Sequence, residues 1–136
     1  MTRVTLDSNI YLSALVFGGK PMRLIEMAVE GEIEVAISDP IIEEVRGNLQ
    51  KKFGWSDARA AEAIDTITAF TRHVIPTGII NAVPSDPDDD RVLECAIAAS
   101  SEVIVSGDAD LLRLGGYGGI RILKVAEFLS ARGQGG

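Results

Sequence analysis

The amino-acid sequence predicts an α/β fold, a three-layer α/β/α sandwich with a central, mostly parallel sheet of four or five strands. Short β-prone runs alternate with helical runs along the chain, which is the pattern of right-handed strand–helix–strand units. The β-prone runs are mostly continuously apolar, as expected of strands that helices cover on both faces. The length of 136 residues fits one domain. We expect this domain to span residues 1–131, with residues 132–136 as a flexible, glycine-rich tail.

The first half of the chain is expected to form two strands and four helices. A glycine pair ends the first helix, a proline lies in the first turn of the second, and Ser38 and Ser56 cap the third and fourth. In chain order we expect a strand at 3–6, helices at 9–17 and 21–31, a strand at 34–37, and helices at 39–53 and 57–72.

The second half begins with a weak strand signal at 73–75 and a loop at 77–87 that contains Gly78, Pro84 and Pro87. The remaining elements are a helix at 88–100, a strand at 102–106, a short helix at 109–114, a glycine-rich turn at 115–119, a strand at 120–123 and a helix at 125–131. Strands and helices therefore alternate to the end of the chain.

Composition argues against several classes of protein. No apolar run approaches the roughly 18 residues that a membrane-spanning helix needs, and Asp7 comes too early for a secretory signal. The single cysteine, Cys95, cannot form an internal disulfide and is expected in the core, so we expect a cytoplasmic location. The net charge of −7 argues against a protein that grips nucleic acid by bulk positive charge.

Acidic residues follow the predicted strands at the edge where open α/β sheets bind ligands. Asp7 follows the first strand, Asp108 follows the strand at 102–106, and Glu44 lies in the helix after the second strand. A further acidic run opens the helix after the long loop; its members are Asp86, Asp88, Asp89 and Asp90. Crowded carboxylates are costly unless cations neutralise them, and an all-oxygen ligand set suits Mg²⁺ or Mn²⁺ rather than Zn²⁺.

Each of these acids also has a purely structural interpretation. Asp7 and Asp108 can cap the helices that follow them, and the run at 86–90 can be a solvated cap that favours the helix dipole. Glu44 can lie on a solvated helix face, although it is nearer to the apolar stripe than Glu43.

Helical geometry separates the aspartates of the acidic run. Asp89 aligns with the apolar stripe of its helix, so its carboxylate is expected to point to the edge of the sheet. Asp90 is expected on the outer face, four residues before Glu94. We therefore favour Asp89 as the ligand, with Asp86 and Asp90 as supporting or alternative ligands.

Together, Asp7-Ser8-Asn9, the segment from Ser38 to Val45, DPDDDRVLECA and SGDADLL resemble the motifs of PIN domains in order and spacing. The resemblance spans Val4 to Phe128 and is greatest to small bacterial and archaeal PIN proteins grouped with VapC-type toxins. It implies a PIN-like fold and a metal-dependent ribonuclease. The implied catalytic acids are Asp7, Glu44, Asp89 and Asp108. Asp7, Asp89 and Asp108 match the metal ligands, and Glu44 is a ligand or a base that orients water.

The resemblance also implies supporting residues. Asn9 and Ser106 match polar positions that hold the first and last acids in place, and Asp110 matches a frequent additional acid. Ser106 stands where threonine is more usual. The third motif offers several adjacent aspartates, so it fits the family pattern in registers one residue apart.

One or two Mg²⁺ or Mn²⁺ ions in such a site would bind the scissile phosphate, neutralise its developing charge and lower the pKa of a bound water. Part of the acidity would then hold cations, and would not exclude an RNA substrate. Arg46 and Lys20 are candidate contacts to RNA phosphates, whereas Lys51 and Lys52 fit compensation of the helix dipole better. The resemblance further implies a homodimer and a cognate antitoxin protein.

Two other functions remain as alternatives. A non-catalytic PIN module that binds RNA or a protein partner is disfavoured, because all four matching acids are present. A receiver domain or a haloacid-dehalogenase-like phosphatase is disfavoured, because Asn9 stands where the phosphatase needs a second aspartate and the receiver's acidic pair is absent. The single histidine, His73, is expected to be an ordinary strand or loop residue.

Overall fold

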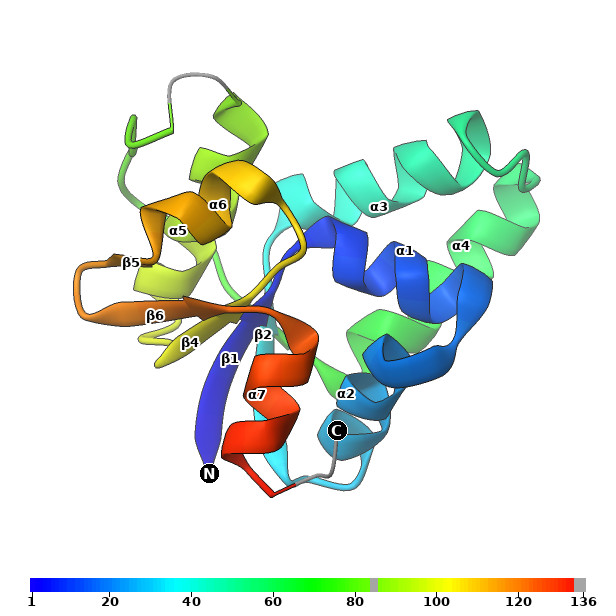
Figure 1. Cartoon of the computed structure of the whole chain (residues 1–136). Helices are drawn as coiled ribbons and strands as arrows, with labels where there is room; N and C mark the ends of the chain where they lie inside the picture. Colours follow the sequence, from blue (N-terminus) through cyan, green and yellow to red (C-terminus); the bar gives the residue numbers. More distant parts are fainter. Residues whose placement is uncertain (84–85, 134–136) are drawn as a thin grey trace.

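The computed structural model describes residues 1–83 and 86–133. Pro84 and Ser85, which belong to the loop expected at 77–87, and residues 134–136 of the expected tail lie outside the described residues. A central sheet of six strands, in the order β3-β2-β1-β4-β6-β5, has helices on both faces (Figure 1). The α/β sandwich predicted from the sequence is thereby confirmed.

Within residues 1–83 and 86–133, thirteen helices and strands make up this architecture. The strands are β1 (Thr2–Leu6), β2 (Ile33–Ile37), β3 (Arg72–His73), β4 (Val103–Val105), β5 (Gly116–Tyr117) and β6 (Ile120–Leu123). The helices are α1 (Ser8–Phe17), α2 (Gly19–Val29), α3 (Asp39–Lys51), α4 (Asp57–Phe70), α5 (Pro87–Ala98), α6 (Ala109–Leu114) and α7 (Val125–Ala131). All neighbouring strands pair in parallel except β5 and β6, which are antiparallel.

The sheet has six strands rather than the four or five expected, because a two-residue strand carries too little pattern to be read from sequence. β5 forms inside the segment expected to be a turn. The actual turn is Gly118-Gly119, and both residues have positive φ, as a tight hairpin of two residues requires. At the other edge, α4 ends at Phe70 and Thr71 is extended, so β3 starts at Arg72, one residue earlier than expected.

The core lies on both sides of β1 and β4, the central strands. Val4, Leu6 and Ile104 are fully buried in these strands. Helix α5 packs against β1, β2 and β4, while α7 crosses the opposite face in Figure 1. None of the described helices is long and apolar enough to cross a membrane.

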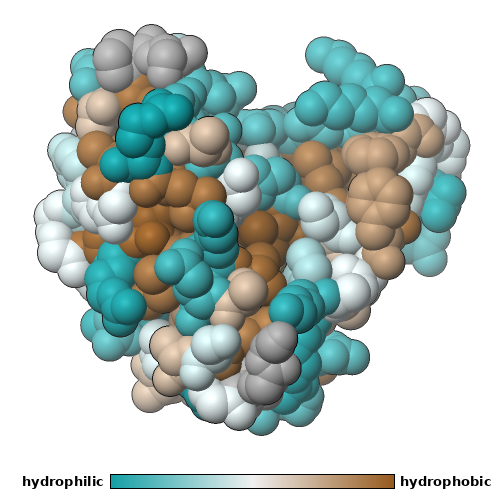
Figure 2. Space-filling model, viewed as in Figure 1, coloured by the Kyte–Doolittle hydropathy of each residue, from teal (hydrophilic) through white to brown (hydrophobic). Residues whose placement is uncertain are grey.

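Hydrogen bonds extend the sheet by one residue at its carboxyl edge. The N–H of Asp7 donates to the carbonyl of Val105, and the N–H of Ser106 donates to the carbonyl of Leu123, both at 3.0 Å. These bonds place Asp7 and Ser106 side by side at the ends of β1 and β4. Figure 2 shows a hollowed surface near this edge, between the side formed by α5 and α6 and the arm formed by α3 and α4.

Candidate metal centre

Three carboxylates meet at the carboxyl edge of the sheet. Asp86, Asp89 and Asp108 each offer an oxygen, and these oxygens lie within 4.8 Å of one another. Asp86 precedes α5, Asp89 lies in its first turn, and Asp108 precedes α6. The fold therefore joins two segments of the chain in one acidic cluster.

Asp7 lies beside this cluster and is held from several directions. Its carboxylate accepts hydrogen bonds from the Ser106 hydroxyl at 2.7 Å, the Ser8 N–H at 2.7 Å and the Asn9 amide at 3.2 Å. Burial raises the pKa of Asp7, the bonds from Ser106 and Ser8 oppose this, and the nearby charge of Asp108 raises it further. Asp7 is thus both the cap of α1 and a member of the acidic site.

Glu44 reaches the same region from α3. Its carboxylate accepts a hydrogen bond from the Ser8 hydroxyl at 2.6 Å. Burial is the main reason that the pKa of Glu44 is raised, and the charges of Asp88, Asp7 and Asp86 add to the effect. The Ser8 bond and these charges together place Glu44 near Asp7 and Asp86.

Asp89 is the most strongly perturbed acid of the site. It is 4% exposed, and burial raises its pKa to about 8, with further contributions from a hydrogen bond to Asp108 and from the charges of Asp108, Asp86 and Asp7. Its Oδ2 is buried and has no hydrogen-bond partner. A buried carboxylate oxygen without a donor is the atom that a bound cation would satisfy.

Asp108 combines capping with a place in the cluster. Its Oδ1 accepts the N–H groups of Asp110 at 2.9 Å and Leu111 at 3.1 Å, and the Asp108 N–H donates to the Ser106 hydroxyl at 2.9 Å. The Ser106 side chain therefore accepts from Asp108 while it donates to Asp7. One hydroxyl links two of the acids.

The predicted position of Asp90 on its helix is wrong. We expected it on the outer face of its helix, but it is 2% exposed and its Oδ1 accepts the N–H groups of Ala82 at 2.8 Å and Val83 at 2.9 Å. Residues 80–83 fold over this face of α5 and bury it. Glu94, on the same face of α5 as Asp90, also binds this segment: its carboxylate accepts the N–H of Ile80 at 2.9 Å.

The remaining candidates lie in simpler settings. Asp110 accepts a bond from Arg113 at 2.7 Å, and Arg46 is paired with Glu43 at 2.7 Å. Lys20 lies exposed near the start of α2. The other two residues singled out in the sequence behave as expected, because Cys95 is fully buried and His73 on β3 pairs with Asp39 at 2.8 Å.

Sequence reasoning gave no role to Ser8 and a lesser one to Asp86. Ser8 is 3% exposed and links Asp7 to Glu44. Its position between Asp7 and Asn9 was the available signal, but the contact to α3 depends on tertiary structure. Asp86 caps α5 through the N–H of Asp88 and still offers an oxygen to the cluster.

The donor set fits a hard divalent cation. All the converging donors are carboxylate oxygens, and neither a histidine nor a cysteine joins them among the described residues. Such a set suits Mg²⁺ or Mn²⁺. The unpartnered Oδ2 of Asp89 is consistent with this assignment.

Comparisons with known proteins agree with this architecture. Residues 3–110 match the sequence profile of a family described as PIN domain. The fold is similar to the crystal structure of VapBC2 from Rickettsia felis bound to a DNA fragment from the promoter, with a TM-score of 0.63, 13% identity, and coverage of 89% of this chain and 97% of that one. It is also similar to PAE2754 from Pyrobaculum aerophilum, with a TM-score of 0.63, 14% identity, and coverage of 98% and 90%. A comparison with curated proteins gives no match.

Proposed function

The chain belongs to the PIN domain family, and we propose that it is a divalent-metal-dependent endoribonuclease that hydrolyses RNA phosphodiesters. The observation that carries the proposal is the convergence of Asp86, Asp89 and Asp108 within 4.8 Å at the sheet edge. Asp7 and Glu44 lie near these acids, since the charge of Asp108 raises the pKa of Asp7 and the charge of Asp86 raises the pKa of Glu44. Crowded carboxylates of this kind are stable only when protons or cations compensate them.

In this proposal Asp7, Asp89 and Asp108 hold Mg²⁺, with Mn²⁺ as a substitute, and Asp86 is a further candidate ligand. The bound ion would stabilise charge on the scissile phosphate and lower the pKa of a water molecule. Ser106 and Asn9 hold Asp7 in place, so that its carboxylate does not turn away from Asp108. Oriented ligands of this kind raise metal affinity.

Glu44 is proposed to orient the attacking water or to accept its proton. A general base has to lie within hydrogen-bond reach of the proton it removes and needs a suitable pKa. Burial and the neighbouring aspartates raise the pKa of Glu44, which makes it a better proton acceptor than an exposed glutamate. The Ser8 hydroxyl limits its rotation by binding one oxygen.

We further propose that the ribonuclease is the toxin of a toxin–antitoxin pair in the cytoplasm. Support comes from the likeness in fold to VapBC2, which was crystallised with a DNA fragment from the promoter. The test is expression of the chain alone and together with the product of the neighbouring reading frame. Growth arrest that the second protein relieves is the expected outcome, and harmless expression alone would contradict the toxin role.

A homodimer is the assembly that we propose. Ile75, Ile79 and Ile97 are exposed large apolar residues. The shallow pockets beside them share Thr77 and Gly78, so these isoleucines belong to one continuous surface. Light scattering of the purified protein tests the proposal, because a monomer at high concentration would exclude it.

Cleavage of single-stranded RNA by the purified protein tests the enzymatic proposal. We expect activity with Mg²⁺ and none after EDTA treatment. Binding of RNA without any cleavage, with or without metal, would favour the non-catalytic module instead.

A further inference from the structure

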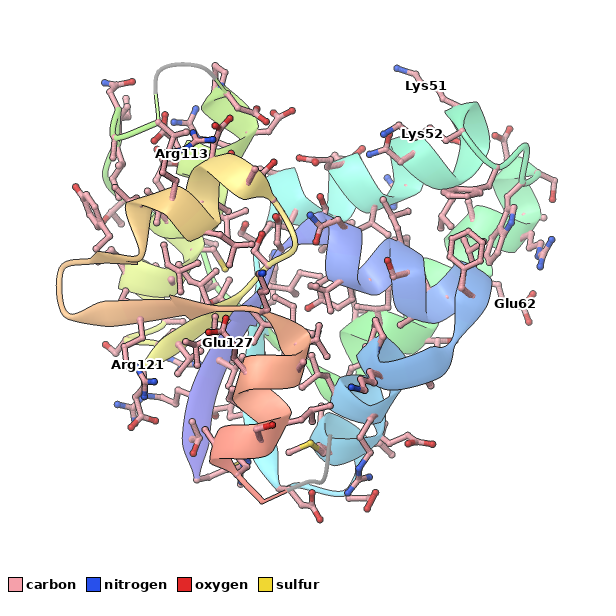
Figure 3. The ribbon with its side chains drawn as sticks, in the orientation of Figure 1. Lys51, Lys52, Glu62, Arg113, Arg121 and Glu127 are labelled. Carbon is pink, nitrogen blue, oxygen red and sulfur yellow. The ribbon has the colours of Figure 1, made fainter. Side chains whose placement is uncertain are left out.

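In the part of the chain that the structure describes, positive side chains without an acidic partner lie close together where α3 turns into α4. Several arginines elsewhere are paired with carboxylates: Arg23, Arg46, Arg72, Arg91 and Arg113. Lys51 and Lys52 are exposed, and neither forms an ion pair among the residues that the structure describes. Figure 3 shows both at the end of α3. In a chain with a net charge of −7, two unpaired lysines in sequence form a local basic site.

Exposed aromatic rings lie next to these lysines. Phe17 at the end of α1 is 76% exposed and Phe53 is 37% exposed, and their rings meet edge to face with centroids 5.9 Å apart. Trp55 is half-buried, and the Arg59 guanidinium covers its ring at 3.7 Å. Figure 2 shows apolar surface on the right-hand arm, below hydrophilic side chains at its top. We call the group of Phe17, Lys51, Lys52, Phe53, Trp55 and Arg59 the basic–aromatic corner.

Two helices connect this corner to the acidic site. Helix α1 begins directly after Asp7 and ends at Phe17, and α3 carries Glu44 and ends at Lys51. The two helices pack against each other, and in Figure 1 both run from the carboxyl edge of the sheet to the arm. At about 1.5 Å per residue, α1 spans roughly 15 Å. An RNA strand whose scissile phosphate lies at the carboxylates would therefore reach the corner within a few nucleotides.

The chemistry of the corner fits a nucleic acid strand. Lysines bind phosphates, and exposed aromatic rings stack on bases of any sequence. The nearby acid Asp57 accepts a hydrogen bond from Gln50 and forms no ion pair with Lys51 or Lys52 among the described residues. A protein partner that bound the aromatic rings through apolar contacts alone would make no use of these two lysines. The combination of charge and rings favours RNA as the occupant.

We propose that the basic–aromatic corner binds single-stranded RNA that extends from the scissile phosphate. The proposal rests on the ribonuclease function and adds a second contact region to it. Phe17 and Phe53 would stack on bases, and Lys51 and Lys52 would contact phosphates. Because no base-edge contacts are involved, the corner would add affinity for longer RNA without strong sequence preference.

Binding of fluorescently labelled RNA to the full chain tests this proposal, with Ca²⁺ present to slow any cleavage. A short RNA that covers the carboxylates alone is compared with a strand of about 12 nucleotides. We expect Phe17→Ser to weaken binding of the longer strand by about 5-fold or more. Replacing both lysines (Lys51→Gln with Lys52→Gln) should reduce the slope of log affinity against log salt by about 1.4, since each single-strand phosphate contact contributes about 0.7.

Two matched variants control for lost charge and lost apolar surface. Arg121→Gln removes an exposed cation on β6, which Figure 3 places far from the arm. Val29→Ser removes an apolar side chain of 65% exposure from the end of α2, a position with no role in the proposed site, dimer or corner. Circular dichroism checks that all variants are folded. We expect them to be, because the replaced side chains are exposed.

The outcomes separate this inference from the proposed function. If wild type cleaves RNA with Mg²⁺ but the corner variants bind the longer strand as the controls do, the corner inference is overturned and the function stands. If Phe17→Ser changes the molar mass or the binding of a co-expressed protein but not the RNA affinity, the corner is a protein interface and the inference is also overturned. If wild type neither binds nor cleaves RNA, both proposals fall.

Discussion

The hydroxyl of Ser8 donates to the carboxylate of Glu44 at 2.6 Å, across 36 positions of the chain. The same residue donates its backbone N–H to Asp7 at 2.7 Å. Ser8 is buried at the start of α1, so it couples the acid at the end of β1 to the acid on α3. The relative placement of Asp7 and Glu44 therefore depends on one small side chain.

Ser8→Ala should lower kcat/KM for RNA by about 10- to 100-fold, the usual effect of removing a group that orients a metal-site residue. The backbone bond to Asp7 survives the substitution, so the loss would come from the freed Glu44. Ser8→Thr keeps the hydroxyl and should retain most activity. A cleavage assay comparing both variants checks this, and an alanine variant as active as wild type would refute the role of Ser8.

Ser106→Ala should weaken Mg²⁺ binding by a similar factor, about 10- to 100-fold. The Ser106 hydroxyl donates to the Asp7 carboxylate and accepts from the backbone N–H of Asp108, so its loss frees the Asp7 carboxylate and loosens the segment that carries Asp108. Calorimetric titration with Mg²⁺ measures the change. Ser106→Thr serves as the control that keeps the hydroxyl, and unchanged affinity in the alanine variant would contradict the prediction.

Without metal, the protein should become less stable as the pH rises from about 5 to about 8. Burial raises the pKa of Asp89 to about 8 from an ordinary value of 3.8. Between these values the folded state holds a proton that the unfolded state has lost, so the free energy of unfolding falls with rising pH. The raised pKa values of Asp7 and Glu44 act in the same direction.

In the proposed function Mg²⁺ replaces this proton, and it should then raise Tm more at about pH 8 than at about pH 5. Thermal unfolding of the EDTA-treated protein at both pH values, with and without Mg²⁺, measures both effects. A metal-free Tm that increases across this range, or a Tm at the higher pH that Mg²⁺ leaves unchanged, would show that the acids are compensated in another way.

Asp90→Ala should destabilise the fold by about 1–3 kcal/mol, because the N–H groups of Ala82 and Val83 lose their acceptor. The loop carrying these groups leads into Asp86, so metal affinity should fall as well. Asp88→Ala removes an exposed acid from the same helical turn and is the control for lost charge. Equal unfolding free energies for the two variants, by urea titration, would contradict the anchoring role of Asp90.

Most of the fold could be predicted because its central strands and long helices have strong local patterns. β1, β2 and α3 begin and end within a residue or two of the expected limits. Of the short edge strands, β5 (Gly116–Tyr117) was not predicted, and β3 (Arg72–His73) only overlaps the weak signal at 73–75. Pairing with a neighbouring strand, more than their own sequence, makes these residues strands. Ser38 lies at the cap position expected of it, yet its side chain makes no capping bond.

The acids of the candidate site could be predicted, since Asp7 and Asp108 each follow a strand and the run at 86–90 opens a helix, whereas Glu44, inside α3, had the weaker signal of its distance from the apolar stripe. Their orientation could not, because it depends on what covers each helix. Asp90 was expected on the outer face of α5, but residues 80–83 cover it, and its carboxylate binds the N–H of Val83. Likewise the partner of Ser8 lies on another helix, which no local pattern specifies.

Metal-dependent RNA cleavage by the wild type and Asp89→Asn tests the central claim most directly. Asp65→Asn, an exposed acid on α4, is the matched control. We predict that EDTA abolishes cleavage by wild type and by the control, that Mg²⁺ restores it, and that Asp89→Asn lowers it by at least about 100-fold, because several kcal/mol of charge stabilisation depend on the metal. Cleavage by Asp89→Asn at the wild-type rate, or wild-type cleavage that persists in EDTA, would contradict the assignment of the acidic cluster as the metal centre.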